Sequence, residues 1–445
     1  MLVKIAPEDV AGYVRSKPTG RYSRVIWWLF ETFANVRLDL PDVRTGNYVD
    51  LLDPEIYVTG PARRIKRQRV NVNLLGTVDF SPMVRTKGLG TWNEAEMRKR
   101  CEEIVGEYPA GIFERAVRYL YAKESKSSHE IERETPDQKR AEKFIRLLEQ
   151  AWHRDFVNKP ALVELQQAIV EPRFANKGWR SEKDNLIDRQ VYVGETLGPG
   201  MERVHFAAPK PDDLAGLMSG FVTMAWLAIE GPLGKRWETH PTPTLVAAAV
   251  VSFTFDFLHP FSDGNGRIHR FLLHHVLARR GFGPTGIILP VSAVILNRPR
   301  EYDQALESFS KPLMERVEYT LDERQRMTVT NDTADFYRYI DCTELTRITI
   351  DFIRETIETE LPAELRYLTM FDEIRSKMRD IIELPDRIAD LFLNLVRQNG
   401  GTISKKKRAL PEFAPLTDAE IAAMEAVVRD GLAILPPSAP ESGLD

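Results

Sequence analysis

The chain has 445 residues, enough for roughly three domains of about 150 residues each. Its composition is 43% hydrophobic and 28% charged, which excludes a fibrous, collagen-like or wholly disordered protein. There are 61 Lys and Arg and 65 Asp and Glu, so the formal net charge is -4, which argues against binding nucleic acid over the whole surface. The two cysteines, Cys101 and Cys342, lie far apart and predict neither a disulfide framework nor a structural zinc site.

The N-terminus, MLVKIAPEDV, lacks the apolar region of a secretory signal. The apolar stretch 241–255 is shorter than the roughly 18 residues that a membrane span needs. We therefore expect a soluble cytoplasmic protein with no membrane partner.

In chain order, we expect a mixed region over 1–109, a helical core over 110–320 and a helical region with a disordered tail over 321–445. In the first of these, the basic run 63–72 alternates in the manner of one strand with a solvated face. No aromatic residue is interleaved in this run, so a nucleic-acid interface is the weaker interpretation.

The central region combines helical periodicity with one β-hairpin. Apolar residues at helical spacing predict an amphipathic helix and comprise Phe144, Leu147, Leu148, Ala151, Trp152 and Phe156. Residues 190–206 predict two short strands around a long, mobile, glycine-rich tip. Residues 244–258 are apolar on nearly all sides, which is typical of a buried central helix. A second helix is expected over 267–280, with Gly281 just beyond its end.

The C-terminal region is helical by periodicity and has a sharp Gly-Gly turn at 400–401. Its basic run 405–408 favours a solvated turn, with a DNA-contacting turn of winged-helix type or a targeting signal as the alternatives. The predicted fold class is mainly α: a helical bundle with a small hairpin, flanked by the mixed and the helical regions.

The loop between the two central helices reads HPFSDGNGRIHR at 259–270 and concentrates polar residues that have no packing use. Gly264 and Gly266 allow successive N–H groups to turn inward as an anion nest that opens onto a helix N-terminus. Arg267 and Arg270 lie on one face of that helix, and two guanidinium groups beside a nest suit several phosphates.

Two further residues of the loop complete a chemical site. His259 can exchange a proton near neutral pH, so it is the candidate general base. Asp263 supplies the hard oxygen ligand that a phosphate-bound Mg²⁺ requires. The loop therefore indicates a polyphosphate site with a base at one edge, which points to transfer chemistry on a nucleotide.

This loop resembles the signature of Fic-domain proteins, HxFx(D/E)GNGRxxR, at every constrained position, and the resemblance covers about residues 110–320. It implies a Fic-type helical bundle that transfers AMP from ATP to a Ser, Thr or Tyr hydroxyl of a protein. By the same resemblance, His259 would deprotonate that hydroxyl and Asp263 would hold Mg²⁺ against the α- and β-phosphates.

The resemblance also implies the remaining contacts of the phosphates. Asn265 and the amides of Gly264 and Gly266 would stabilise charge on the α-phosphate. Arg267 would bind the β-phosphate and Arg270 the γ-phosphate, and pyrophosphate would be the leaving group.

Segments outside the loop take part in the same resemblance. Residues 291–306 look like the family's adenine-side segment, in which Asn297 and Tyr302 would contact the nucleotide. The hairpin 190–206 lies where the family carries the flap that docks the target protein by strand addition, and self-modification is a further option.

Residues 127–134 resemble the family's inhibitory helix motif, (S/T)xxxE(G/N), with Ser128 and Glu132 in the Ser and Glu positions. Glu132 would pair with Arg270 and occupy the γ-phosphate site, so that ATP would bind unproductively. The chain departs from the motif at Arg133, where the family usually has Gly or Asn.

Other interpretations stay open. The same fold can transfer another nucleotide, phosphocholine or phosphate, although the retained Gly-Asn-Gly favours nucleotidyl transfer. In some members of the family that the loop resembles, removal of AMP depends on the inhibitory Glu, so Glu132 leaves that reaction open. If residues 381–435 form a DNA-binding regulatory module, their affinity for DNA should fall steeply with salt concentration. The spacing of His269, His274 and His275 does not match a zinc motif.

Overall fold

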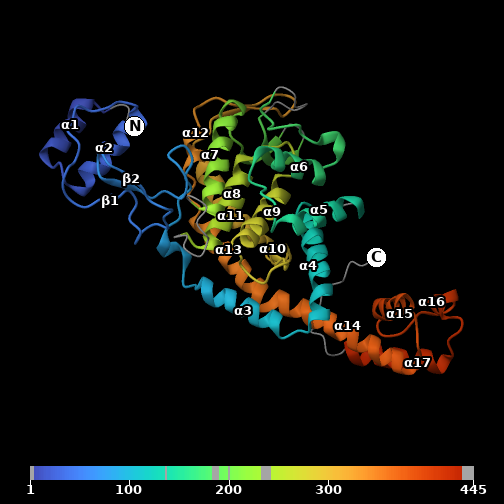
Figure 1. Ribbon diagram of the computed structural model, residues 1–445. Coiled ribbons are helices and arrows are strands. Elements are labelled where there is room, and N and C mark those ends of the chain that lie inside the picture. The colour runs from blue at the N-terminus through green and yellow to red at the C-terminus, as the bar shows by residue number, and fades with distance from the viewer. Residues whose placement is uncertain (1–4, 136–137, 183–189, 199–200, 232–241, 433–445) are drawn as a thin grey trace. The chain divides into compact units, whose positions relative to one another are not determined.

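The computed structural model describes residues 5–135, 138–182, 190–198, 201–231 and 242–432 (Figure 1). The chain divides into two compact units, and we describe each by itself. The first unit comprises residues 1–99 and 121–354, and the second comprises residues 100–120 and 355–445.

The N-terminal part of the first unit is a pair of helices and a small sheet. Helices α1 (Pro7–Ser16) and α2 (Arg21–Ala34) pack against each other around a shared apolar core. The sheet has the order β1-β3-β2, with β1 parallel and β2 antiparallel to the middle strand. Its strands are β1 (Val49–Asp50), β2 (Arg63–Ile65) and β3 (Val70–Val72).

The prediction of a single strand over 63–72 is wrong, because the run turns back on itself between β2 and β3. Arg67 lies in this turn and pairs with Glu31 at 3.1 Å and with Asp42 at 2.7 Å. Arg69 then takes a positive φ of 50° before β3 begins. Part of the positive charge of the run is therefore neutralised by carboxylates of the same unit.

Helix α8 (Thr244–Leu258) forms the centre of the first unit, and every residue of it except Asp256 is buried. The prediction of a buried central helix is confirmed, and the cause is an apolar surface on all sides that must be enclosed. Figure 1 shows α8 among its neighbours, of which α7 and α9 pack directly against it. The other core helices are α5 (Gln138–Gln150), α6 (Lys159–Ile169), α7 (Pro211–Glu230), α9 (Asn265–Arg279), α10 (Val291–Asn297) and α11 (Pro299–Met314).

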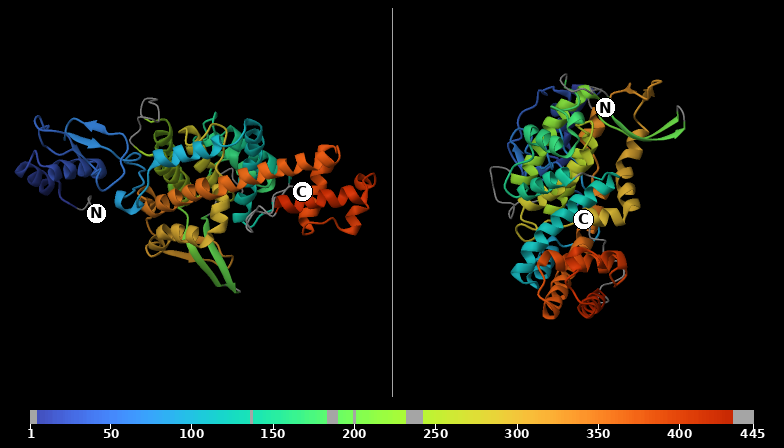
Figure 2. Two further views of the ribbon diagram at one scale, coloured as in Figure 1. Left: turned by 90° about the horizontal axis from the view of Figure 1, so that it is seen from below. Right: turned by 90° about the vertical axis from the view of Figure 1, so that its right-hand side faces the viewer.

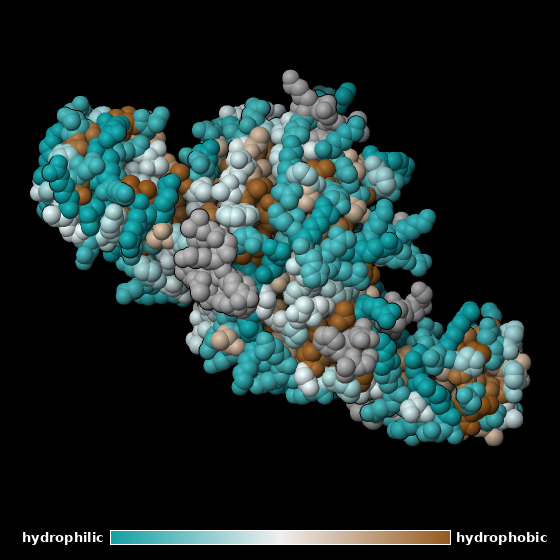
Figure 3. All heavy atoms as spheres, in the orientation of Figure 1, coloured by the Kyte–Doolittle hydropathy of each residue, from teal (hydrophilic) through white to brown (hydrophobic). Residues whose placement is uncertain are grey.

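Helix α7 is the one described helix that is long and apolar enough to cross a membrane. It lies outside the apolar stretch 241–255. Half of its most apolar window is buried inside the fold, as in the core helix of a globular protein, so a single helix of this kind is weak evidence for a span. On the face shown in Figure 3, hydrophilic residues separate the apolar patches.

The predicted hairpin is present as β4 (Tyr192–Gly198) and β5 (Met201–Ala207). The prediction of a long loop at its tip is wrong, because antiparallel pairing continues from Tyr192 opposite Ala207 to Gly198 opposite Met201. Residues 199–200 lie outside the described residues. Figure 2 shows the hairpin projecting from the helices, and β5 lies beside α11.

A second short hairpin, β6 (Tyr319–Leu321) and β7 (Met327–Val329), interrupts the region that was predicted to be helical from residue 321 onward. An isolated bridge joins Gln190 to Met327. The other helices of the chain are α3 (Glu94–Gly106), α4 (Ala110–Ile131), α12 (Ala334–Arg338) and α13 (Thr343–Glu355).

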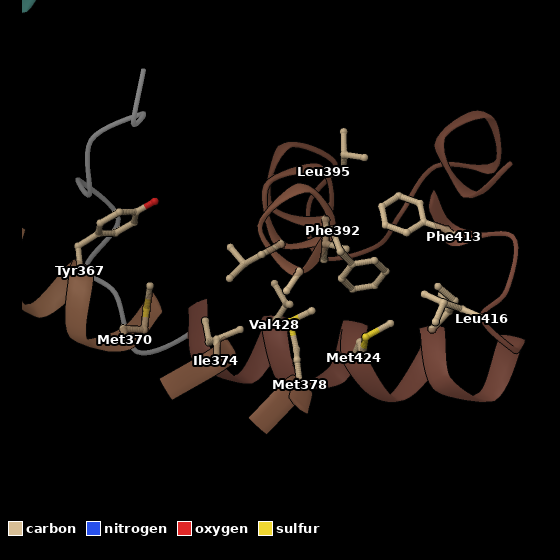
Figure 4. Close-up of a cluster of buried hydrophobic side chains, with 14 residues drawn as sticks. Tyr367, Met370, Ile374, Met378, Phe392, Leu395, Phe413, Leu416, Met424 and Val428 are labelled. Atoms are coloured by element: carbon tan, nitrogen blue, oxygen red, sulfur yellow. The ribbon is translucent and has the colours of Figure 1, made fainter. Parts of the chain in front are cut away.

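The second unit contains helices and turns, with no strand among its described residues. The helical prediction is confirmed, and the described part offers no strands for the wing of a winged helix. Figure 4 shows its apolar core, where Phe392 and Phe413 meet Met424. Its main helices are α14 (Leu361–Ile381), α15 (Asp386–Gln398), α16 (Lys405–Arg408) and α17 (Asp418–Leu432).

The basic run of the second unit is the single turn of α16. Its lysines are exposed, as a solvated turn requires, whereas Arg408 turns inward and donates to the carbonyls of Phe413 and Leu416 at 2.7 Å each. Gly400 and Gly401 both have positive φ, which confirms the predicted sharp turn before it.

Candidate active site

The backbone of residues 259–264 turns sharply between α8 and α9. His259 ends α8 in the left-handed region, with φ 47° and ψ 56°. Gly264 has a φ of 89° and is followed by Asn265, the first residue of α9. The helix begins two residues earlier than predicted, while Gly281, with φ 63°, follows its end as predicted.

Asn265 uses both ends of its side chain to hold this turn closed. Its Oδ1 accepts from the Phe261 N–H at 3.1 Å, and its Nδ2 donates to the Phe261 carbonyl at 2.9 Å. The side chain is buried. Asn265 therefore shapes the nest, and its contact with an α-phosphate stays a prediction.

Arg180 holds the same loop from outside, and no sequence signal pointed to it. Its Nε donates to the His259 carbonyl at 2.9 Å, and its backbone N–H donates to the Pro260 carbonyl at 2.8 Å. The side chain is fully buried. A buried guanidinium thus fixes the backbone on which the candidate base is carried.

Asn176 and Gln166 complete this outer support. The Oδ1 of Asn176 accepts from the Ser262 N–H at 3.1 Å, and Gln166 Nε2 donates to the Asp263 carbonyl at 3.3 Å. We call Gln166, Asn176 and Arg180 the loop cradle. Sequence reasoning missed the cradle because its members lie about 80 to 100 residues before the motif and belong to no motif of their own.

His259 presents a neutral imidazole. Its Nδ1 lies 3.1 Å from the Asp256 carbonyl, which only accepts, so Nδ1 carries the proton and Nε2 is left as the acceptor. Burial lowers the pKa of His259 to about 4, and the positive charge of Arg180 acts in the same direction. An unprotonated nitrogen near neutral pH is what a general base requires.

A groove with a volume of about 920 Å³ passes His259 between the β4–β5 hairpin, α11 and the end of α8. Phe206 of β5 and Asp303 of α11 contribute to its walls. Asp256 also lines it, and burial together with the charge of Glu132 raises the pKa of this carboxyl to about 7. Asp256 was missed in the sequence, where the one available signal was a lone carboxylate in an otherwise apolar helix.

Arg267 and Arg270 begin α9 with almost fully buried side chains, which are 2% and 1% exposed. Arg267 pairs with Glu134, Nη1 to Oε2 at 2.7 Å, and with Asp263, Nη2 to Oδ1 at 3.0 Å. Arg270 pairs with Glu132, Nη2 to Oε1 at 2.7 Å. Each guanidinium therefore has a carboxylate partner where the resemblance implies a phosphate.

The Ser and Glu positions of the inhibitory motif both meet Arg270. Arg270 donates from Nε to the Ser128 hydroxyl at 2.8 Å and from Nη2 to the Ser128 carbonyl at 2.7 Å. Burial opposes ionisation of Glu132, but the Arg270 guanidinium outweighs it and holds the pKa of Glu132 below its usual range. The structure therefore assembles the predicted pair in its charged form.

Helix α4 ends in a turn that positions these carboxylates. The Glu134 N–H donates to the His129 carbonyl at 3.0 Å and the Arg133 N–H donates to the Glu130 carbonyl at 2.9 Å, which is a Schellman motif. Arg133 has a φ of 57°, the left-handed position of that motif. The motif carries Glu132 and Glu134 to the two arginines, although its left-handed residue is Arg instead of Gly or Asn.

Gly266 lets the two helix ends approach each other. A Cβ at this position would overlap the Glu132 carboxylate in its present place, so a larger residue would require that side chain to shift. The positive end of α9 stabilises the carboxylate, whereas the negative end of α4 opposes it. The Glu132 carboxylate therefore lies beside Gly266 at the first turn of α9, while the Gly264 N–H is bonded to Asp263.

The structure brings one of the two predicted adenine-side residues to the site. Tyr302 is buried beside Arg270, and burial raises the pKa of its hydroxyl. Its ring centroid lies 6.2 Å from that of Phe253. Asn297 is the last residue of α10 and is exposed.

The other histidines of α9 have structural contacts. His274 Nε2 lies 2.8 Å from the buried Glu124 carboxylate, and His275 Nδ1 lies 2.9 Å from the Ala151 carbonyl. Among the described residues, no group of three or more His, Cys, Asp or Glu side chains is placed to hold a metal ion.

Asp263 fits the part of a single carboxylate ligand for Mg²⁺. One of its oxygens, Oδ1, accepts from the Gly264 N–H at 2.6 Å and faces Arg267. The side chain is 50% exposed, so it can offer an oxygen to a hydrated cation. Magnesium commonly binds through one or two carboxylates, with phosphate and water as its other ligands.

Comparisons with known proteins point to one family. The Fic/DOC family matches residues 156–277, which include the hairpin, α8 and the 259–270 loop. Two curated relatives are each named Protein adenylyltransferase Fic: that of Culex quinquefasciatus is 38% identical and that of Aedes aegypti 31% identical, over 133 residues each. Each alignment covers 29% of this chain and 21% of the relative, so the chain spans about a fifth of the length of these relatives.

Two solved structures were also found. A Fic family protein from Desulfovibrio desulfuricans matches with a TM-score of 0.38 and 18% identity, over 72% of this chain and 84% of that one. A Fic domain containing signaling protein from Bacteroides thetaiotaomicron matches with a TM-score of 0.38 and 15% identity, over 62% of this chain and 97% of that one.

Residues 156–277 therefore form a Fic domain within the chain. Its mainly helical first unit carries the family's signature loop between α8 and α9.

Proposed function

We propose that this chain is a protein adenylyltransferase that transfers AMP from ATP to a Ser, Thr or Tyr hydroxyl of another protein. The observation that carries the proposal is a neutral His259 beside a nest whose two buried arginines hold carboxylates in place of phosphates. The curated relatives that match this segment are named adenylyltransferases, which supports the same reaction.

In this reaction, Nε2 of His259 accepts the proton of the target hydroxyl while the hydroxyl oxygen forms a bond to the α-phosphorus. The bond from the α-phosphorus to the oxygen that bridges to the β-phosphate breaks, and pyrophosphate leaves with the electron pair. The amides of Gly264 and Gly266 and the positive end of α9 stabilise the charge on the α-phosphate.

The phosphates bind where the carboxylates now lie. Arg267 binds the β-phosphate and Arg270 binds the γ-phosphate. Among the described residues, Nε of Arg267 and Nη1 of Arg270 are buried without a hydrogen-bond partner, so phosphate oxygens would satisfy two donors. Asp263 would hold Mg²⁺, which supplies charge neutralisation on the phosphates.

The target segment lies in the groove beside the hairpin, with its backbone adding to a strand edge and its hydroxyl at His259. A hydroxyl of a second copy of the chain is an equally suitable acceptor, so self-modification belongs to the proposal. Two buried cysteines without a disulfide support a reducing compartment, and we place the reaction in the cytoplasm.

The closed site is autoinhibited in this proposal. Glu132 holds Arg270 through a charged pair at 2.7 Å, so the γ-phosphate of ATP has no partner and the α-phosphate is not aligned for attack. Release of Glu132 is then the step that activates the enzyme.

The test is to incubate the full chain, and its Glu132→Gly and His259→Ala forms, with ATP labelled at the α- or at the γ-phosphate. We expect α-label on protein, mainly with Glu132→Gly, and its loss by about a thousandfold or more when His259→Ala is added, because the general base is then absent.

The outcomes separate the parts of the proposal. If label from the γ-phosphate appears on protein, the reaction is phosphorylation and the proposed adenylylation is wrong. Equal α-labelling by the unchanged chain and Glu132→Gly would remove autoinhibition and keep the transfer.

Removal of AMP is a second candidate, favoured by the ordered, charged Glu132 at the α9 terminus. Release of AMP from a pre-labelled target by the unchanged chain, and its absence with Glu132→Gly, would establish it. Transfer of another nucleotide or of phosphocholine is also compatible with the fold. Competition experiments with these donors would distinguish them from ATP.

A further inference from the structure

We propose that Glu134 is a second lock on the site and determines which nucleotides the closed site can bind. The inference rests on the proposed function, because it assumes that Arg267 is the β-phosphate ligand. Glu132 would then block the γ-phosphate position and Glu134 the β-phosphate position.

The contact of Glu134 is as direct as that of Glu132. Its Oε2 lies 2.7 Å from Nη1 of Arg267, and Nη1 also donates to the Ile169 carbonyl at 3.0 Å. The Glu134 N–H is fixed by its bond to the His129 carbonyl. The Schellman turn therefore delivers two carboxylates, two residues apart, to two guanidinium groups that lie three residues apart on α9.

The strength of this pair follows from its surroundings. The Glu134 side chain is 34% exposed, and two exposed partners would gain little from pairing. Arg267, however, is 2% exposed, and hydrogen bonds to a charged group that is cut off from water are stronger than those on the surface. A β-phosphate must displace this carboxylate before it can bind Nη1 of Arg267.

The two locks differ in the ligands that they exclude. A carboxylate on Arg270 alone would hinder ATP and leave room for ADP, which has no γ-phosphate. A carboxylate on Arg267 hinders ADP and ATP alike, because both carry a β-phosphate. AMP has neither phosphate and should bind the same in the presence or absence of Glu134.

The experiment is calorimetric titration of the full chain with AMP, ADP and a non-hydrolysable ATP analogue. We expect Glu134→Gln to tighten ADP binding about tenfold and to leave AMP binding unchanged. The matched control is Glu130→Gln, which removes an exposed carboxylate from the same helix end, where Glu130 lies 3.8 Å from Lys126 and contacts neither arginine.

Glu132→Gly supplies the complementary measurement, since it should tighten binding of the ATP analogue more than binding of ADP. The proposal is overturned if Glu134→Gln changes ADP affinity no more than Glu130→Gln does, while nucleotides bind measurably. If no nucleotide binds to any variant, including the form with both Glu132→Gly and Glu134→Gln, the proposed function fails and the second lock fails with it.

Discussion

Arg133 occupies a backbone conformation that residues with a Cβ seldom adopt. Its φ of 57° is the left-handed position that ends α4, where glycine is free of the clash between Cβ and the following carbonyl. The departure from the family's Gly or Asn therefore concerns the stability of this turn, while Glu132 and Glu134 keep their places.

We expect Arg133→Gly to raise the free energy of unfolding of this turn by about 1 kcal/mol, because the strain is removed. The midpoint of thermal unfolding and hydrogen exchange over residues 124–134 measure it. Lys126→Gly is the control. Lys126 lies inside α4, so this change should lower the free energy of unfolding by about 1 kcal/mol. A loss of stability in Arg133→Gly as well would contradict a strained turn.

In the proposed reaction, His259 should set the pH dependence of transfer. Because burial and Arg180 lower its pKa to about 4, the base is unprotonated throughout the neutral range. Glu132 acts in the opposite direction, so Glu132→Gly should lower this pKa further. Initial rates of α-labelling by Glu132→Gly should stay level from about pH 8 down to about pH 5.5, whereas an acid limb centred near 6.5 would mean a solvated imidazole.

At the scale of elements, the loop cradle decides how accurately the motif loop is held. Arg180→Met removes the bond to the His259 carbonyl and should lower kcat/KM for transfer about a hundredfold, since small displacements of a catalytic group are costly. Circular dichroism should show the helices intact. Arg173→Met, at an exposed side chain, should leave the rate unchanged. Equal rates for both variants would remove the positioning role.

The elements that could be predicted are those with a local pattern. The apolar run of α8 predicted a buried helix, and the motif predicted that Arg267 and Arg270 lie together near the start of α9, because spacing along one helix fixes their face. The start of α9 was missed by two residues because Asn265 satisfies the loop backbone through its side chain, which spacing does not reveal.

The remaining parts depend on contacts between distant segments. Arg180 lies 79 positions from His259 along the chain, and Glu134 lies 133 positions from Arg267. In each pair, no local sequence pattern around one residue predicts its contact with the other. The length of the hairpin was also missed, because a glycine-rich tip favours a loop until cross-strand pairing is known.

At the scale of the whole molecule, enclosed titratable groups set the pH dependence of stability. Burial lowers the pKa of His259 and His275 to about 4 and of His269 to about 3, so between about pH 4 and 6.5 these sites bind protons mainly when the chain is unfolded. Asp256, whose pKa burial raises to about 7, binds one proton only when the chain is folded.

The net difference is roughly two protons in favour of the unfolded state near pH 5.5, so stability should fall as the pH drops from about 7 to 5. Thermal unfolding midpoints in matched buffers measure this. His275→Gln, which lies away from the motif loop, should make the dependence shallower. A midpoint that rises on acidification would show that Asp256 outweighs the histidines.

The last turn of α4 holds Glu132 and Glu134 where the phosphates of a nucleotide would bind, so folding of this turn competes with nucleotide binding. If that turn is unwound for a fraction f of the time, the apparent dissociation constant of ATP equals the intrinsic constant divided by f. Each 1.4 kcal/mol by which a partner steadies or loosens the turn would then change the apparent affinity tenfold. If the proposed function holds, an effector has no need to reach the 259–270 loop, because a change in the fraying of residues 129–134 would be enough to set the ATP concentration at which the chain responds.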